Sequence, residues 1–183
     1  MGPMTYALCQ KPVIGVAMFV ASLCVFPPLI RSEPLSLATA GATASKDFVV
    51  PVDKSYSFDL AFEFPSLEAI RRDNVVGSGY GKGCDDAVKY EDLPASWSNV
   101  FGHPIPIHVS IQRKSDGRVV VDQTFVALCM FASAGGEHPT KWRRIGRVDL
   151  TRGAYRVEMT NLEAQAGLEG VATSFSLVGG HGK

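Results

Sequence analysis

The chain has no excess of charge of either sign, because its 183 residues include 18 Lys and Arg against 18 Asp and Glu. This balance argues against a nucleic-acid-binding protein that relies on bulk positive charge. The sequence also lacks βα units and internal repeats, which argues against parallel α/β folds and solenoids. Hydrophobic residues make up 46% of the chain, enough for a packed core and too many for a disordered protein.

Recognisable catalytic and metal-binding motifs are also missing. The four histidines form no HExxH pair, and the cysteines are not spaced as zinc ligands. The glycine-rich stretch at 77–83 does not run into the Lys-Ser/Thr of a phosphate-binding loop. We therefore expect no catalytic residue, no metal and no cofactor. A hydrolase with an unfamiliar arrangement of residues stays as an alternative.

The first 44 residues are typical of an export signal. Lys11 precedes 19 residues without a formal charge, and small residues follow at 38–40 and 42–44. This order predicts a secretory signal peptide, cut after Ala40 or Ala44, and a periplasmic location. The alternative is an uncleaved membrane anchor, because spanning a bilayer takes roughly 20 apolar residues. Lipidation at Cys24 is a minor third option.

Residues 45–183 are expected to form a single all-β domain. The clearest strand is 55–64, where apolar and polar residues alternate, so one face should be buried and the other wet. Further strands are expected at 48–52, 105–112, 118–125, 143–150, 155–159 and 170–178. Ser66 is the expected N-cap of one short helix over 67–74, and Asp116-Gly117 predicts a hairpin turn. About seven strands predict an antiparallel β-sandwich of immunoglobulin-like or jelly-roll type.

Two cysteines, Cys84 and Cys129, fall within this domain. In an oxidising compartment they can form a disulfide, which would stabilise by about 4 kcal/mol on the chain-entropy model. Two buried thiols are an equal alternative, because Cys129 lies in an apolar run where a free cysteine packs well.

The segment from residue 77 to residue 104 has little periodicity, and an ordered loop this long is uncommon and usually functional. Its acidic and aromatic side chains suit contact with a partner: Tyr80, Asp85, Asp86, Tyr90, Glu91, Asp92 and Trp97. We interpret the loop as the surface that meets a protein partner. The alternatives are a small-ligand or glycan site on the same aromatic residues, and an insertion without a partner.

One basic cluster is present, at 141–144 with Arg147. Cations beside Trp142 suit contact with anionic lipid, nucleic acid or an acidic protein. We favour the simpler interpretation that the cluster is the polar face of a strand, with Trp142 partly packed.

Three segments of the chain resemble small exported bacterial proteins of the domain-of-unknown-function family numbered 5625. They are 48–60, the strand at 105–107 with its hairpin, and 150–157 followed by Asn161-Leu162 and Phe175. The resemblance implies an exported β-sandwich of a Gram-negative envelope and brings no catalytic residues. Some similar envelope proteins look like immunity partners of secreted antibacterial toxins.

These observations together predict an exported, envelope-associated binding protein that is not an enzyme. Its partner would be a protein, and immunity to a secreted effector is one specific form of that role. The alternative is an envelope module that binds a small ligand or glycan. We expect no nucleic-acid partner, and membrane contact only through the N-terminal segment.

Overall fold

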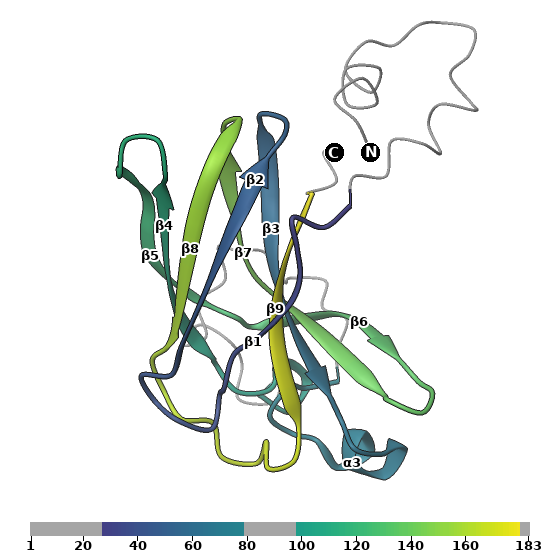
Figure 1. The fold of residues 1–183 in the computed structure, drawn as a ribbon. Helices are drawn as coiled ribbons and strands as arrows, with labels where there is room; N and C mark the ends of the chain where they lie inside the picture. The colour runs from purple at the N-terminus through teal and green to yellow at the C-terminus, as the bar shows by residue number, and fades with distance from the viewer. Residues whose placement is uncertain (1–26, 79–97, 180–183) are drawn as a thin grey trace, which may run out of the picture.

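The computed structural model describes residues 27–78 and 98–179, which form a sandwich of two antiparallel sheets (Figure 1). The elements are β1 (Ile30–Pro34), β2 (Thr43–Val50), β3 (Lys54–Glu63), α3 (Leu67–Arg72), α4 (Ser98–Phe101), β4 (Pro106–Arg113), β5 (Val119–Val126), β6 (Cys129–Ala134), β7 (Thr140–Leu150), β8 (Gly153–Asn161) and β9 (Ala172–Gly179). One sheet has the order β1-β9-β3-β7-β6 and the other β2-β8-β4-β5. The all-β sandwich is confirmed, with nine strands in the described residues rather than about seven; β1 and β6 are the additional ones.

Among the nine strands of the described residues, only two consecutive pairs form hairpins within one sheet. These are β4–β5 and β6–β7, and each of the other connections passes from one sheet to the other. The Asp116-Gly117 turn is confirmed, since Gly117 has a φ of 70° and the Arg118 amide donates to Asp116 Oδ1 at 3.1 Å. Sheet-crossing connections tie the two layers together at both ends.

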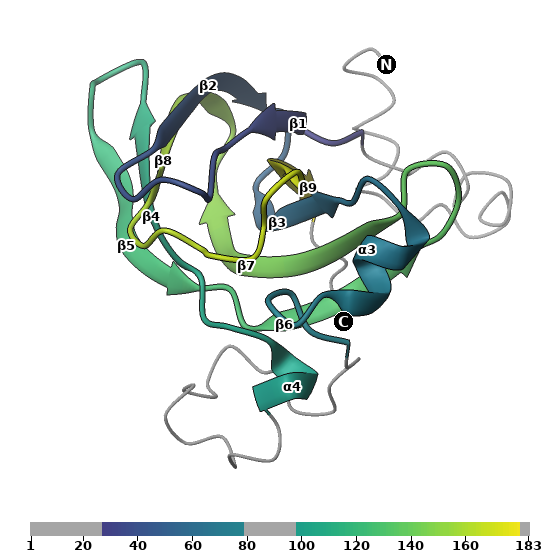
Figure 2. The same ribbon diagram turned by 90° about the horizontal axis from the view of Figure 1, so that it is seen from below.

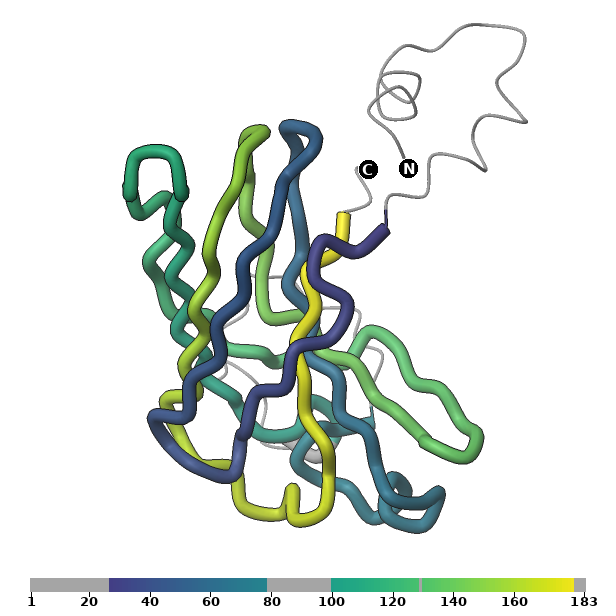
Figure 3. The backbone as a smooth tube through the Cα atoms, in the orientation of Figure 1, coloured from purple at the N-terminus to yellow at the C-terminus, as the bar shows by residue number. Residues whose placement is uncertain are grey.

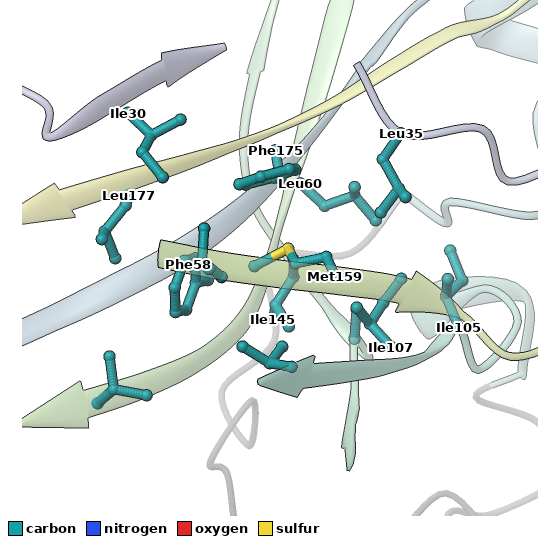
Figure 4. Packing of buried hydrophobic residues seen from close by; sticks show 14 of the residues in the cluster. Ile30, Leu35, Phe58, Leu60, Ile105, Ile107, Ile145, Met159, Phe175 and Leu177 are labelled. Carbon is teal, nitrogen blue, oxygen red and sulfur yellow. The ribbon is translucent and has the colours of Figure 1, made fainter. Parts of the chain in front are cut away.

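The core lies between the sheets and is centred on β3. The five apolar side chains predicted for its inner face, Tyr56, Phe58, Leu60, Phe62 and Phe64, are at most 2% exposed. Figure 4 shows Phe58 and Leu60 beside Phe175 and Leu177 of β9, with Ile107 and Met159 of the opposite sheet across from them. Burying each such side chain stabilises the fold by about 1.5–3 kcal/mol.

The second face of β3 is less exposed to water than its alternation predicted. Ser57 and Asp59 are only 1% and 6% exposed. The reason is that β3 is the middle strand of the five, paired with β9 on one side and β7 on the other. Arg144 of β7 covers Asp59, with its Nε 3.0 Å from Oδ1.

The sandwich also includes residues upstream of the expected boundary at residue 45. β1 pairs with β9, so the first and last described residues lie side by side (Figure 3). Leu35 and Leu37 are each 1% exposed, and the Asn161 amide nitrogen donates to the Leu37 carbonyl at 3.2 Å. The domain therefore starts at or before Ile30, and the small residues at 38–44 lie on the β1–β2 connection and the start of β2.

Two tyrosines fix the turns where the chain crosses between sheets at one end. The Tyr56 hydroxyl donates to the Val52 carbonyl at 2.7 Å, and the Tyr155 hydroxyl donates to the Thr151 carbonyl at 2.8 Å. The turns lie side by side at the top of Figure 1. A hydroxyl bonded to backbone a few residues upstream is the same device as the tyrosine corner of immunoglobulin domains.

The predicted helix is present as α3, two residues shorter than expected. Ser66 is its N-cap, and its Oγ accepts a hydrogen bond from the Ala69 amide at 3.1 Å. None of the helices within residues 27–78 and 98–179 is long and apolar enough to cross a membrane.

Candidate functional site

Two segments of the chain, 73–78 and 100–104, lie against each other and flank residues 79–97 in the sequence. We call this pair of segments the neck. The Ser78 amide donates to the Val100 carbonyl at 3.1 Å, and the His103 amide donates to the Val75 carbonyl at 2.8 Å. The backbones of the two segments are therefore held together just outside residues 79–97.

Two glycines make this close approach possible. Gly77 and Gly102 have φ angles of 84° and 72°, in the left-handed region that favours glycine. A Cβ on Gly77 would lie 2.6 Å from the Val100 carbonyl oxygen, and one on Gly102 would lie 2.2 Å from that of Val75. A side chain at either position would force the neck apart.

The first segment of the neck is organised by Asp73. Its Oδ1 accepts hydrogen bonds from the amides of Val75 and Val76, both at 3.0 Å, which turns the chain after α3. Its Oδ2 accepts from Lys141 Nζ at 2.6 Å, and the same ammonium donates to the Gly77 carbonyl at 2.6 Å. Both charged side chains are buried, so each needs the other.

The second segment is held by Arg143, which is fully buried. Its Nη1 donates to the His103 carbonyl at 2.8 Å, with a longer contact of 3.4 Å to that of Val75. Its Nη2 donates to the carbonyls of Phe101 at 2.9 Å and Leu128 at 2.7 Å. Phe101 is the last residue of α4, so the bond to its carbonyl ties the end of α4 to β7, and Figure 2 shows α4 below β6. A planar guanidinium with five donors suits this role better than an ammonium would.

The interpretation of the basic cluster as the polar face of a strand was therefore wrong for two of its members. Lys141 and Arg143 face the interior at the neck, so they are not on the polar face of a strand, and neither is available to lipid, nucleic acid or an acidic protein. Their side chains are needed inside because the neck presents backbone carbonyls that lack partners in a sheet. Trp142 is partly exposed, as expected.

The residues predicted to contact a partner lie in 79–97, outside the described residues: Tyr80, Asp85, Asp86, Tyr90, Glu91, Asp92 and Trp97. Cys84 is outside them too, and although Cys129 begins β6, its side chain is not among those described. The contact surface and the disulfide both stay predictions. In 27–78 and 98–179, no three His, Cys, Asp or Glu side chains lie close enough to hold a metal ion.

A second polar cluster lies on the outer face of the five-stranded sheet, the face turned away from the four-stranded sheet. Asp59 and Arg144 form an ion pair there, and the guanidinium carbon of Arg144 lies 4.8 Å from the ring centroid of Phe131. Burial raises the pKa of the Asp59 carboxyl, and this effect outweighs the opposing influence of Arg144 and Arg147.

Comparison with solved structures finds the same fold in a protein from Sulfurospirillum deleyianum. Its crystal structure aligns with a TM-score of 0.63 at 20% sequence identity, covering 85% of this chain and all of that one. At this level of identity the likeness shows the fold alone. No curated protein matches the chain. The model of a domain of unknown function, DUF5625, matches residues 32–179. That match spans β2 to β9 and all but the start of β1, and the chain therefore belongs to the DUF5625 family.

Proposed function

We propose that this protein is an exported, non-catalytic binding protein of the cell envelope that meets a protein partner through residues 79–97. Inhibition of a secreted effector, as an immunity protein would do, is the specific form of this role that we favour. The observation that carries the proposal is the neck, where two buried cations fix the backbone on both sides of that segment.

The construction of the neck supports binding because it reduces the entropy lost when a partner is met. Fixing the backbone on both sides of a binding segment removes part of the conformational freedom that association would otherwise cost. A buried Lys–Asp pair and a buried Arg are expensive to maintain. Neither Lys141 nor Arg143 packs apolar surface as well as a Leu would, so a role in holding the neck accounts for their placement.

The proposal is tested by capturing the partner. The full chain with a C-terminal tag would be expressed in the host envelope, purified by affinity and examined by quantitative mass spectrometry. We expect one secreted protein at a stoichiometric ratio. The double variant Asp85→Lys, Asp86→Lys should lose it, because two charge reversals would repel a basic partner surface.

The matched control is the double variant Asp122→Lys, Glu158→Lys, since both residues are exposed on the four-stranded sheet. It carries the same change of charge and should retain the partner. A clean protein without a stoichiometric partner would overturn the proposal. Retention of a glycan that is lost with Trp97→Ala would favour the alternative, a glycan-binding envelope module, and turnover of a chromogenic hydrolase substrate would show an enzyme.

The contacts of β1 restrict how the proposed export signal is processed. A cut after Ala40 or Ala44 would detach β1 with Leu35 and Leu37, and would remove their burial from the fold. We therefore expect the exported protein to begin before Ile30, or to keep its N-terminal segment as an anchor. N-terminal sequencing of the envelope protein tests this, and a start at Gly41 or Ser45 would contradict it.

A further inference from the structure

The outer face of the five-stranded sheet carries two arginines of β7, Arg144 and Arg147, next to each other on that face. Ile145 is the extra residue of a β-bulge in β7. Because of this bulge, Arg144 and Arg147 both lie on the outer face, opposite Asp59 and Ser57 of β3. Without the extra residue, an alternating strand would turn one of these two arginines toward the core.

Arg144 is held in one orientation by contacts on two sides. Its Nε lies 3.0 Å from Asp59 Oδ1, and its guanidinium carbon lies 4.8 Å from the ring centroid of Phe131. The Asp59 side chain is 8% exposed, so the carboxylate anchors the arginine from beneath. The Arg144 side chain itself is 30% exposed, and within the described part of the chain its two Nη atoms make no hydrogen bond.

The Arg144 guanidinium, already paired with Asp59 and packed on Phe131, can bind a second carboxylate. Its Nε side is occupied by Asp59, and its Nη edge presents two parallel donors. That edge matches the two oxygens of a carboxylate in spacing and in plane. Fixing the guanidinium plane in advance reduces the rotamer entropy that a flexible arginine would lose on binding.

Aromatic surface adjoins the Arg144 guanidinium. Trp142 lies on the same face, two residues before it in β7, and is partly exposed. Its cross-strand neighbours are Ala61 and Ala132, whose methyl side chains are too small to cover an indole ring. Phe131, in the neighbouring strand β6, is 40% exposed. The patch therefore combines a fixed cation with flat apolar surface.

The position of the patch selects between a sugar and a peptide. β7, which carries Arg144 and Trp142, is hydrogen-bonded to β3 and β6, so its backbone has no free edge to offer a peptide strand. Of the strands that form the patch, β6 with Phe131 alone lies at an edge of the described sheet. Recognition at Arg144 and Trp142 must therefore come from side chains alone. A rigid ring that stacks on Trp142 and bears a carboxylate fits such a surface better than a flexible peptide.

We propose that this outer-face patch, made of Arg144, Trp142 and Phe131, is a binding site for an acidic sugar, with Arg144 holding the sugar carboxylate through its Nη edge. The site lies on the described strands and does not depend on residues 79–97. Its failure and the failure of the proposed protein partner are therefore separate outcomes.

The test is isothermal titration calorimetry on the full-length protein in mild detergent. The probes are trigalacturonate, the neutral galactotriose and triglutamate. We expect trigalacturonate to bind and galactotriose not to bind. Arg144→Lys keeps a cation beside Asp59 but loses the planar fork, so it should weaken binding by about tenfold or more.

The control is Arg156→Lys, the same substitution at an exposed arginine of the four-stranded sheet, which should bind as the unaltered protein does. Trp142→Leu provides a second variant if Arg144→Lys fails to fold, and it should weaken binding roughly fivefold. No binding of trigalacturonate, or equal binding by Arg144→Lys, would overturn the proposal. Tighter binding of triglutamate would make this a peptide site instead.

Discussion

Replacement of Arg143 by Met tests whether the neck depends on one buried guanidinium. The substitution keeps a long unbranched side chain in the same space but removes every donor. Three carbonyl oxygens, those of Phe101, His103 and Leu128, then lose hydrogen bonds of 2.7–2.9 Å.

The magnitude follows from the number of acceptors. A buried acceptor left without a partner costs about 1–3 kcal/mol. His103 is exposed and Leu128 is half-buried, so water can replace part of what is lost. We therefore expect the free energy of unfolding to fall by about 3 kcal/mol for Arg143→Met, near the lower end of the sum. In a domain of about 150 residues, this lowers the Tm by roughly 10 °C.

The assay is thermal and urea unfolding of the full-length protein and its variants. Arg156→Met is the matched control, because the Arg156 side chain is exposed and, among the described residues, makes one hydrogen bond, to Ser45 Oγ at 3.0 Å. Its effect should stay within about 0.5 kcal/mol. An Arg143→Met variant no less stable than Arg156→Met would refute the reasoning.

Three further predictions concern other parts of the fold. Gly102→Ala should lower the free energy of unfolding in urea by at least about 2 kcal/mol, because the new Cβ would lie 2.2 Å from the Val75 carbonyl oxygen. The control Gly41→Ala has a similar φ of 78° but nothing within 4 Å of its Cβ, so it should lower that free energy by about 1 kcal/mol. Equal losses in the two variants would contradict the prediction. The pKa of the Asp59 carboxyl is raised in the folded protein, so the unaltered protein loses stability as the pH rises through that pKa and the buried carboxyl ionises. Asn cannot ionise, and Asp59→Asn should therefore be at least as stable as the unaltered protein at pH 7. In urea unfolding at a series of pH values, the stability advantage of Asp59→Asn should shrink as the pH falls below the pKa of the folded Asp59 carboxyl. An advantage that grows instead would be inconsistent with a raised pKa. Tyr155→Phe removes a part-buried hydroxyl that donates to the Thr151 carbonyl at 2.8 Å and is also hydrogen-bonded to Thr151 Oγ1 at 3.1 Å. It should lower the free energy of unfolding by about 1 kcal/mol, and an unchanged midpoint would argue against a role for the corner.

Elements with a strong local signal could be predicted from the sequence. The alternation in β3 gave its inner face, Ser66 marked the start of α3, and Asp116-Gly117 marked a hairpin. These features depend on neighbours in the chain, so a short window of sequence is enough to recognise them. β1 was missed because Ile30–Pro34 has no alternation, and its pairing with β9 joins residues far apart in the sequence.

The candidate site depends on contacts that no short window contains. Lys141 and Arg143 alternate with Trp142 and Arg144, and alternation does not say which face of such a strand is inside. Their acceptors are backbone carbonyls and one carboxylate from a segment more than sixty residues away, together with Phe101, His103 and Leu128. Backbone carbonyls carry no signature in the amino-acid sequence. The β-bulge that places Arg144 and Arg147 on one face likewise has no signature in the sequence.

Hydrogen exchange measured by mass spectrometry tests most directly whether the cations of β7 hold the neck. In the full-length protein, the amides of Ser78 and His103 should exchange slowly, because each is bonded to a carbonyl of the opposite segment. In Arg143→Met both should exchange much faster, while peptides from β4 and β8 keep their protection. Equal exchange of the neck in the two proteins would contradict the account.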